Sequence, residues 1–317
     1  MCGIAGIFNY QTNKSVDSAL LTRMYRAITH RGPDEEGFYI NQQAGIGFGH
    51  RRLSIIDLKT GKQPMSNASK DIWIVFNGEI YNFPELKKEL QSKGYRFRTT
   101  SDTEVIIYMY EENGEKAFVR LNGIFAFAIY DKKKKCVILA RDHFGVKPLY
   151  YTLSNGRLLF GSEIKTILQD ASVKKEFDYE AFNSFLTFRY NPSPQTLFKN
   201  IKKLFPAHYL KVTAKDSIKL KSYWDYLPKT NSVISEREAI EEYQRLLHSA
   251  VRRQMISDVP VGLLLSGGVD SAVIGYLMQK ETSEKVKAFT IGFPGKGDFN
   301  ELDDAFRTTE LIELEHY

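Results

Sequence analysis

The sequence has 317 residues, enough for one large domain or two ordinary ones. Its hydrophobic share of 43% and charged share of 26% are typical of a soluble globular protein. The net charge of +6 comes from scattered lysines and does not indicate nucleic-acid binding. Two distant cysteines fit a reducing cytoplasmic compartment. No apolar run approaches the ~20 residues of a membrane helix, and the first residues lack a signal-peptide pattern.

Short strands dominate the first two thirds of the sequence. Apolar and aromatic runs bounded by Gly, Asn or Asp predict strands at 73–81, 123–131, 136–141 and 156–162, with the lysine-rich turn at 131–136 forming a hairpin. Helices are predicted at 84–94, between Pro84 and Gly94, and at 101–114, where Ser101 and Glu104 have the spacing of a capping box. Many strands and few helices predict an α+β domain of layered antiparallel sheets.

A different pattern begins near residue 235. Ser235 and Glu238 form a second capping box before a helix at 235–258. The run VGLLL (261–265) is typical of a strand buried on both faces. A helix at 272–280 and a strand at 286–293 complete a βαβ unit and hence a parallel α/β sheet.

The two patterns predict two domains, at 1–212 and 235–317, with a linker that includes 228–235. The second domain supplies two strands and about two helices, and then LIELEHY (311–317) enters another strand. Too few residues remain for a doubly wound sheet of five or six strands. We therefore expect this domain to be truncated, as the first part of a longer one.

The turn SGGVDS (266–271) joins a buried strand to a helix. Such a turn directs backbone N–H groups at an anion and adds the dipole of the helix. Gly267 and Gly268 allow close approach, Ser266 and Ser271 supply hydroxyl groups, and the carboxylate of Asp270 suits Mg²⁺. The turn resembles the pyrophosphate-binding loop of the PP-loop ATPases, which implies that it binds ATP.

Cysteine at position 2 suggests a specific chemistry. Removal of Met1 would leave Cys2 with both a thiol and a free α-amine. An amine whose ordinary pKa is near ~8 can act as general base at neutral pH without a histidine. The simpler interpretation, a cysteine in a frayed terminus, depends on whether further catalytic groups are present.

Several segments supply groups that such an enzyme needs. In FNGEIYN (76–82), the amide of Asn77 and the N–H of Gly78 can form an oxyanion hole, and Glu79 can hold an ammonium group. In HRRLSIID (50–57), an arginine can bind a carboxylate in bidentate fashion. Asp102 lies at a predicted helix start.

These motifs resemble one family. The N-terminal-nucleophile (Ntn), class II glutamine amidotransferase domain of glutamine-hydrolysing asparagine synthetases has similar segments in the same order from residue 1 to about 210. The segments are MCGIAGIF, HRGPD, HRRLSIIDL, FNGEIYN, SDTEV, GIFAFAIYD and RDHFGVKPLYY, and VPVGLLLSGGVDS continues the resemblance into the synthetase domain.

The resemblance implies a role for each matching residue. Cys2 would be the nucleophile, and Asn77 and Gly78 the oxyanion hole. Glutamine would be bound at its α-carboxylate by Arg52 and at its α-ammonium by Glu79 and Asp102, with backbone of Leu53, Ser54, Ile55 and Ile56 lining the pocket. In the second domain, ATP would be bound by Leu265, Ser266, Gly267, Gly268, Asp270, Ser271 and Ile291, with Mg²⁺ on Asp270.

Other prominent residues are given structural roles. His30 and His50 are expected to make structural hydrogen bonds, and Arg31 to order the glutamine site. Cys136, in an apolar strand, is expected to be an inert core thiol. RDHFGVKPLYY (141–151) is interpreted as domain packing and loop structure, and Lys147 receives no role.

The resemblance implies a glutamine-dependent asparagine synthetase, a carbon–nitrogen ligase. Glutamine would give glutamate and ammonia, and ammonia would aminate adenylated aspartate to give asparagine, AMP and pyrophosphate. The expected ligands are glutamine, aspartate, ATP and Mg²⁺, with no nucleic acid or membrane, and a homodimer stays open. Alternatives are a relative acting on another carboxylate or a sugar-linked acceptor, a glutaminase-only fragment, a non-catalytic interaction module and a nucleotide-binding module.

Overall fold

The computed structural model describes residues 1–12, 14–214, 217–227, 233–293 and 301–317. The chain forms two compact units, Met1–Leu227 and Pro228–Tyr317. Most of the linker predicted at 228–235 lies outside the described residues.

Within the described residues, the first unit contains two six-stranded sheets. The first sheet has the order β10-β8-β9-β1-β3-β2 and the second has the order β12-β11-β7-β6-β5-β4. All of their strand pairs are antiparallel. The strands of the first sheet are β1 (Gly3–Phe8), β2 (Glu35–Asn41), β3 (Ile46–Arg52), β8 (Tyr150–Ser154), β9 (Arg157–Gly161) and β10 (Lys202–Lys203). Those of the second are β4 (Met65–Ser66), β5 (Ile72–Ile80), β6 (Gly123–Asp131), β7 (Cys136–Arg141), β11 (His208–Thr213) and β12 (Ile218–Ser222).

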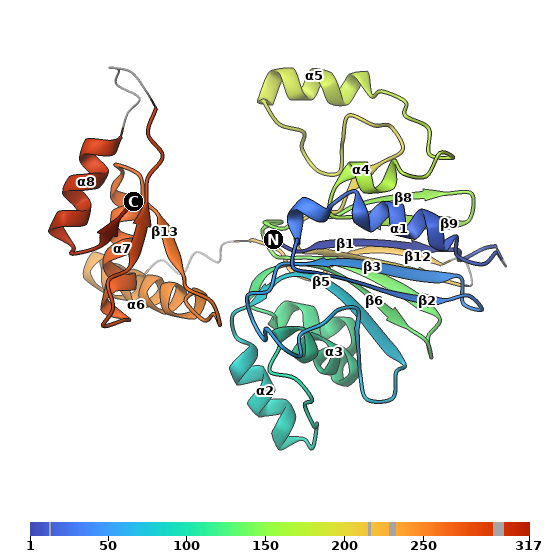
Figure 1. Cartoon of the computed structure of the whole chain (residues 1–317), viewed down its shortest axis with the longest axis horizontal. Coiled ribbons are helices and arrows are strands. Elements are labelled where there is room, and N and C mark those ends of the chain that lie inside the picture. Colours follow the sequence, from blue (N-terminus) through green and yellow to red (C-terminus); the bar gives the residue numbers. More distant parts are fainter. Residues whose placement is uncertain (13, 215–216, 228–232, 294–300) are drawn as a thin grey trace. The chain divides into compact units, whose positions relative to one another are not determined.

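Helices cover the outer faces of the two sheets (Figure 1). One side of the stack carries α1 (Ser18–Arg26), α4 (Ile164–Ile167) and α5 (Tyr179–Phe188), and the other carries α2 (Phe83–Ser92) and α3 (Asp102–Asn113). Two short 3₁₀ turns, at Thr29–Arg31 and Gly114–Arg120, precede β2 and β6. The inner faces share one apolar core that includes Ile4, Phe48, Val75, Leu139 and Phe160. The first unit is therefore a layered α+β domain, as the sequence predicts.

The strand β1 is buried along its whole length, which explains its composition. Every residue of Gly3–Phe8 is buried, because α1 packs on one face and the second sheet on the other. A side chain at Gly6 would place its Cβ 2.3 Å from the ring of Phe160. The segment GIAGIF is thus a central strand that fixes the position of Cys2, directly before it.

The turn at 131–136 is confirmed as a hairpin, since Asp131 pairs with Cys136 between β6 and β7. The capping box predicted at Ser101 is wrong in its second half. Ser101 Oγ accepts a hydrogen bond from the N–H of Thr103, but Glu104 accepts from the backbone N–H groups of Arg98 and Thr99. Glu104 is fully buried, so its carboxylate needs several donors, and the preceding turn supplies them.

The second unit is a small α/β unit. It contains α6 (Glu236–Gln254), β13 (Gly262–Leu264), α7 (Val269–Lys280), β14 (Lys287–Phe289), α8 (Leu302–Leu311) and β15 (Glu315–His316). β13 and β15 each pair in parallel with β14, which confirms the parallel sheet. The capping box of Ser235 and Glu238 is complete at the start of α6.

The prediction that VGLLL is buried on both faces is wrong. Leu263 and Leu265 lie in the core of the second unit, whereas Leu264 is 76% exposed. Leu263 packs against Gly275 of α7. Among the described residues of this unit, the helices thus cover the face of Leu263, and no element covers that of Leu264. An apolar run alone does not reveal how many faces of a strand are covered.

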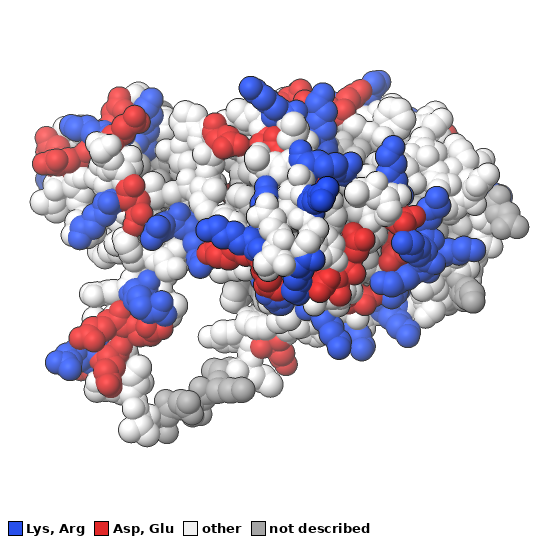
Figure 2. Space-filling model, turned by 90° about the horizontal axis from the view of Figure 1, so that it is seen from below, with Lys and Arg blue, Asp and Glu red and all other residues white. Residues whose placement is uncertain are grey.

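Charged side chains of both signs are interspersed on the face shown in Figure 2, which agrees with the scattered lysines of the sequence. Within the described parts of the chain, no helix combines the length and the apolar character needed to cross a membrane.

Candidate functional site

Strand register brings the predicted catalytic residues together. β1 pairs with β3 so that Gly3 lies opposite Arg51, which places Cys2 beside the end of β3. Asn77, Gly78 and Glu79 lie near the end of β5, in the other sheet. A pocket between these segments is lined by every predicted glutamine-site residue except Ser54, namely Cys2, Arg52, Leu53, Ile55, Ile56, Asn77, Gly78, Glu79 and Asp102. The N–H of Ser54 instead donates to the carboxylate of Asp34, at 2.8 Å.

The thiol of Cys2 is held by the backbone of Leu53. The Leu53 N–H lies 3.4 Å from Cys2 Sγ and donates to it, and Sγ lies 3.5 Å from the Leu53 carbonyl oxygen. Burial raises the pKa of the thiol, although the Leu53 N–H and the nearby amino terminus oppose this. A thiol with a raised pKa is protonated at neutral pH and needs a base to become a nucleophile. Burial also lowers the pKa of the amino group of Met1, which favours its unprotonated form.

Asn77 is fully buried, and both polar atoms of its side chain lack a hydrogen-bond partner among the described residues. A buried amide without partners is costly, so a polar ligand in the pocket would stabilise it. Gly78 follows in β5, opposite Phe125 of β6. A Cβ on Gly78 would lie 2.2 Å from the carbonyl oxygen of Ile124, so the neighbouring strand requires glycine here.

Two carboxyl groups give the pocket an acidic side. Burial raises the pKa of Asp102 to about 7, with the charge of Glu79 adding to the effect and the N–H of Ile80 opposing it. That N–H lies 3.0 Å from Asp102 Oδ2 and ties the start of α3 to the end of β5. Burial also raises the pKa of Glu79, against which the charge of Lys147 acts. A cationic ligand would relieve this destabilised pair of carboxylates.

Arg52 supplies the positive side of the pocket and is 4% exposed. Its Nη1 donates to Glu35 at 2.9 Å, and its Nη2 donates to the carbonyl oxygens of Ile56 and Asp57. These three bonds use three of the five N–H donors of a guanidinium group. The guanidinium therefore also shapes the loop that runs past Cys2.

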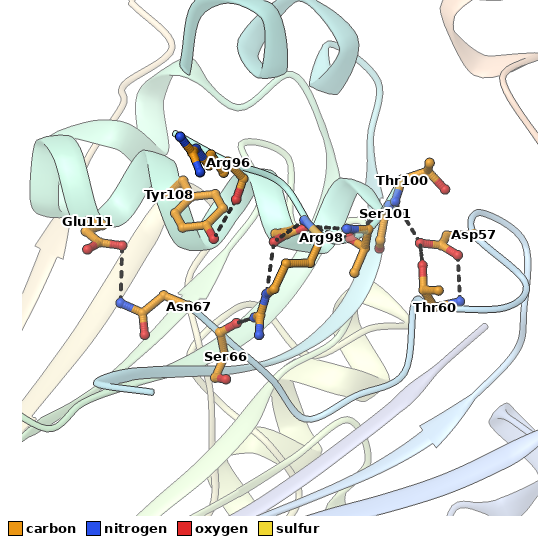
Figure 3. A network of polar contacts seen from close by, with 12 residues as sticks. Asp57, Thr60, Ser66, Asn67, Arg96, Arg98, Thr100, Ser101, Tyr108 and Glu111 are labelled. Carbon is orange, nitrogen blue, oxygen red and sulfur yellow. Dashed lines mark hydrogen bonds and ion pairs between the residues drawn. The ribbon is translucent and has the colours of Figure 1, made fainter. Parts of the chain in front are cut away.

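Asp57 connects that loop to the start of α3. Its Oδ1 accepts from the N–H of Thr60 at 2.7 Å, and its Oδ2 accepts from the N–H of Thr100 at 2.9 Å (Figure 3). Although burial raises the pKa of Asp57, these hydrogen bonds lower it overall. Asp57 thus joins the Arg52 side of the pocket to the Asp102 side.

The histidines have the structural roles that the sequence predicts. His50 Nε2 lies 3.1 Å from the carbonyl oxygen of Phe76, and burial lowers the pKa of His50 to about 3, so it is neutral. His30 Nε2 lies 2.8 Å from the carboxylate of Glu163. Arg31 pairs with the same carboxylate and donates from Nε to the Cys2 carbonyl oxygen at 3.0 Å. Cys136 is fully buried, and burial raises the pKa of its thiol to about 11.

The sequence did not identify every residue of the pocket. Met1, Gly61, Gln63, Phe76, Ser101, Thr103 and Lys147 also line it. Gln63 accepts from the N–H of Phe76 at 2.7 Å, a contact that no local sequence signal predicts. Lys147 follows the RDHFGV turn. The sequence feature that could have pointed to it as a pocket residue is a charge within an apolar run.

The loop at 266–271 follows β13 and enters α7. Ser266 Oγ lies 2.9 Å from Ser271 Oγ, and the Gly267 N–H donates to the carboxylate of Glu301 at 3.1 Å. A loop amide that already binds an anionic oxygen fits a phosphate group. Asp270 is exposed in the first turn of α7. Leu265 is buried and Ile291 is 76% exposed, so the side chains of these two predicted ATP-site residues differ in environment.

Known proteins are similar to both units of the chain. The family model for a glutamine amidotransferase domain matches residues 1–224, and that for asparagine synthase matches residues 242–317. Asparagine synthetase [glutamine-hydrolyzing] 1 of Bacillus subtilis is 39% identical over 100% of this chain and 49% of its own length. An amidase of Penicillium rubens is 32% identical over 99% of this chain and 50% of its own length.

The solved structure of glutamine phosphoribosylpyrophosphate amidotransferase from B. subtilis is similar in fold. Its TM-score is 0.50 at 14% identity, covering 100% of this chain and 65% of that one. The fold is that of the Ntn amidotransferases. The chain belongs to the glutamine amidotransferase family, and it spans about half the length of the curated relatives it matches.

Proposed function

We propose that this chain hydrolyses glutamine at Cys2 and that the ammonia serves an ATP-dependent synthesis of asparagine from aspartate. The observation that carries the first part is Asn77, whose buried amide lacks a partner among the described residues beside the Cys2 thiol. A pocket with a thiol, a donor for an oxyanion, an arginine and two carboxylates matches the groups of a glutamine molecule.

Glutamine would bind by its charged ends. The α-ammonium would lie against Glu79 and Asp102, whose raised pKa values an ammonium group would lower again. The α-carboxylate would lie against Arg52. The side-chain amide would then extend toward Cys2, with its carbonyl oxygen directed at Asn77 and Gly78.

The chemistry would proceed in two steps at the δ-carbon. After removal of Met1, the α-amine of Cys2 would take the thiol proton as sulfur attacks the carbonyl, and the oxyanion would be held by the Asn77 amide and the Gly78 N–H. The amine would give its proton to the leaving ammonia, which leaves a γ-glutamyl thioester. Water would then attack the thioester, and the products would be glutamate and the free thiol.

The second part rests on the loop at 266–271 and on relatives named asparagine synthetase. The loop amides would hold the phosphates of ATP, and Asp270 would hold Mg²⁺, which supplies charge neutralisation when bound. The carboxylate of aspartate would displace pyrophosphate to give β-aspartyl-AMP. Ammonia would then displace AMP to give asparagine. We place this reaction in the cytoplasm, because both cysteines are unpaired.

One relative suggests an acceptor of ammonia other than aspartate. The Penicillium rubens protein that is 32% identical to this chain is named an amidase, so proteins of this architecture are not all named asparagine synthetases. The alternative is that ammonia aminates another carboxylate. Aspartate-dependent formation of AMP from ATP, compared with a panel of other carboxylates, distinguishes the two.

Glutamate release from glutamine tests the glutaminase function. The Cys2→Ala variant should lose the activity, and the matched Cys136→Ala variant should keep it, because Cys136 is an inert core thiol. Mass spectrometry of the amino terminus shows whether Met1 is absent from the active protein. Equal rates for the wild type and the Cys2→Ala variant would refute the assigned nucleophile.

A further inference from the structure

The loop that follows β7 is shaped by a single carboxylate. Asp142 Oδ1 accepts from the N–H groups of Phe144 and Val146, at 3.1 and 2.9 Å. Asp142 Oδ2 accepts from the N–H groups of Lys147 and Phe125, at 3.0 and 3.1 Å. Four backbone donors on one buried carboxylate define the path of the loop from Asp142 to Lys147.

Arg141 holds the same loop from its carbonyl side. Its Nε donates to the carbonyl oxygen of Lys147 at 2.7 Å, and its Nη2 donates to that of Gly145. Nη1 donates to the carbonyl oxygen of Leu204 at 2.7 Å. Gly145 has φ +67°, a conformation that favours glycine. The charged side chains of Arg141 and Asp142 thus build the backbone that carries Lys147.

Lys147 is the side chain that this loop delivers to the glutaminase pocket. It is 7% exposed and lines the pocket together with Met1, Cys2 and Glu79. Burial of an ammonium group is costly, and burial lowers the pKa of Lys147, with the charge of Glu79 opposing this. Arg141 and Asp142 together fix the loop that places Lys147 in the pocket. This arrangement indicates that the charge of Lys147 has a role there.

The groups around Lys147 are those that must lose a proton before catalysis. Burial lowers the pKa of the Met1 amino group, and the charge of Lys147 lowers it further. Met1 and Cys2 line the same pocket, so removal of Met1 would leave the new α-amine of Cys2 in that pocket with Lys147. Burial raises the pKa of Glu79, and Lys147 is the foremost group that opposes this. The other charged groups that act on the amino terminus or on the Cys2 thiol are Arg31, Asp34, Arg52 and Asp102, and Asp142 acts on Lys147 itself.

We propose that Lys147 is a positioning residue of the glutaminase site, whose positive charge favours the unprotonated form of the α-amine that Cys2 carries once Met1 is removed, and the ionised form of Glu79, at neutral pH. The inference rests on the proposed glutaminase function. An unprotonated amine can accept the thiol proton, and an ionised Glu79 can hold the substrate ammonium. One cation therefore prepares both the base and the substrate site through its charge.

The test is the pH dependence of kcat/KM for glutamate release by the full chain. Lys147→Met removes the charge, Lys147→Arg keeps it, and Lys88→Met removes an exposed lysine of α2 as a matched control. At an effective dielectric of about 20, a unit charge roughly 10 Å away shifts a titration by about one pH unit, and a closer charge shifts it more. Lys147→Met should therefore shift the acid limb upward by about one pH unit, a loss of about tenfold at pH 6 with near-normal activity at pH 9.

Lys147→Arg and Lys88→Met should both retain the wild-type profile. A pH-independent loss in Lys147→Met, an unchanged profile, or failure of Lys147→Arg to restore it would overturn the proposal. The pH midpoint for alkylation of Cys2 by iodoacetamide gives a second measurement that does not require glutamine turnover. An upward shift of this midpoint in Lys147→Met, but not in the other two variants, supports the role of Lys147 even if the wild type does not hydrolyse glutamine. Absence of glutamine hydrolysis by the wild type would refute the proposed function instead.

Discussion

The two candidate sites of this chain are built in opposite ways. The candidate glutaminase pocket holds key polar groups on buried side chains, because Asn77, Asp102 and Lys147 are all more than nine-tenths buried. The loop at 266–271 consists of backbone amides on an exposed turn, with Gly268 and Asp270 open to solvent. The pocket holds its charges in fixed positions before the substrate arrives, whereas the loop offers N–H groups to a ligand that brings its own charge.

The largest expected effect is at Asn77. Asn77→Ala removes an oxyanion donor that has no other partner among the described residues. We expect kcat for glutamine hydrolysis to fall by about 10²–10³, the usual loss for one such donor. The Tm should change little, because the amide makes no hydrogen bond within the described residues whose loss would destabilise the fold. Normal kcat in a folded variant would contradict the assignment.

The next effect is a pH dependence of stability at Asp102. Its pKa of about 7 in the folded protein lies above the ordinary value of ~3.9, so the folded state binds the proton more tightly. This contribution to the free energy of unfolding is fully present below pH ~4 and is lost as the pH rises to about 7, by up to ~1.4 kcal/mol per pH unit.

Urea unfolding between pH 5 and pH 8 measures this effect. Asp102→Asn should remove the fall in stability between pH 5 and 7. Asp270→Asn in the exposed loop is the matched control and should leave the pH dependence as in the wild type. An identical pH dependence in the wild type and in Asp102→Asn would show that Asp102 does not titrate in this range.

The smallest expected effects are on stability, from substituting one glycine in each site. Gly78 of the pocket and Gly268 of the loop allow the most direct comparison of the two sites. Gly78→Ala places a Cβ against the backbone of β6, so the free energy of unfolding should fall by about 1–3 kcal/mol, as in other overpacked cores. Gly268→Ala places its Cβ 3.4 Å from Ser266 Oγ, an ordinary contact, and should change stability by less than about 0.5 kcal/mol.

The loop glycine should affect ligand binding instead of stability. Gly268→Ala should weaken ATP binding, measured by calorimetry, because the loop must approach phosphate oxygens closely. Equal losses of stability in the two variants would remove the contrast between a packed pocket and an open loop.

The sequence predicted features that depend on local chemistry. The hairpin between β6 and β7 followed from a polar turn between apolar runs, and the members of the glutaminase pocket followed from motif resemblance. Features set by tertiary contacts were missed. Glu104 bonds to the preceding turn instead of capping its own helix, and Leu264 lies on an uncovered face in the described second unit. Lys147 reaches the pocket only because Arg141 and Asp142 fold the loop that carries it.

The proposed nucleophile and the proposed oxyanion hole lie on different sheets. Cys2 precedes β1 of the first sheet, and Asn77 belongs to β5 of the second. A displacement of one sheet against the other by an ångström would separate sulfur from the amide that must receive the oxyanion. Two features hold the sheets in the alignment that catalysis needs. Side chains of the shared core pack between the sheets, and His50 of β3 bonds to the carbonyl oxygen of Phe76 in β5. Core substitutions far from the pocket are therefore expected to alter turnover as well as stability.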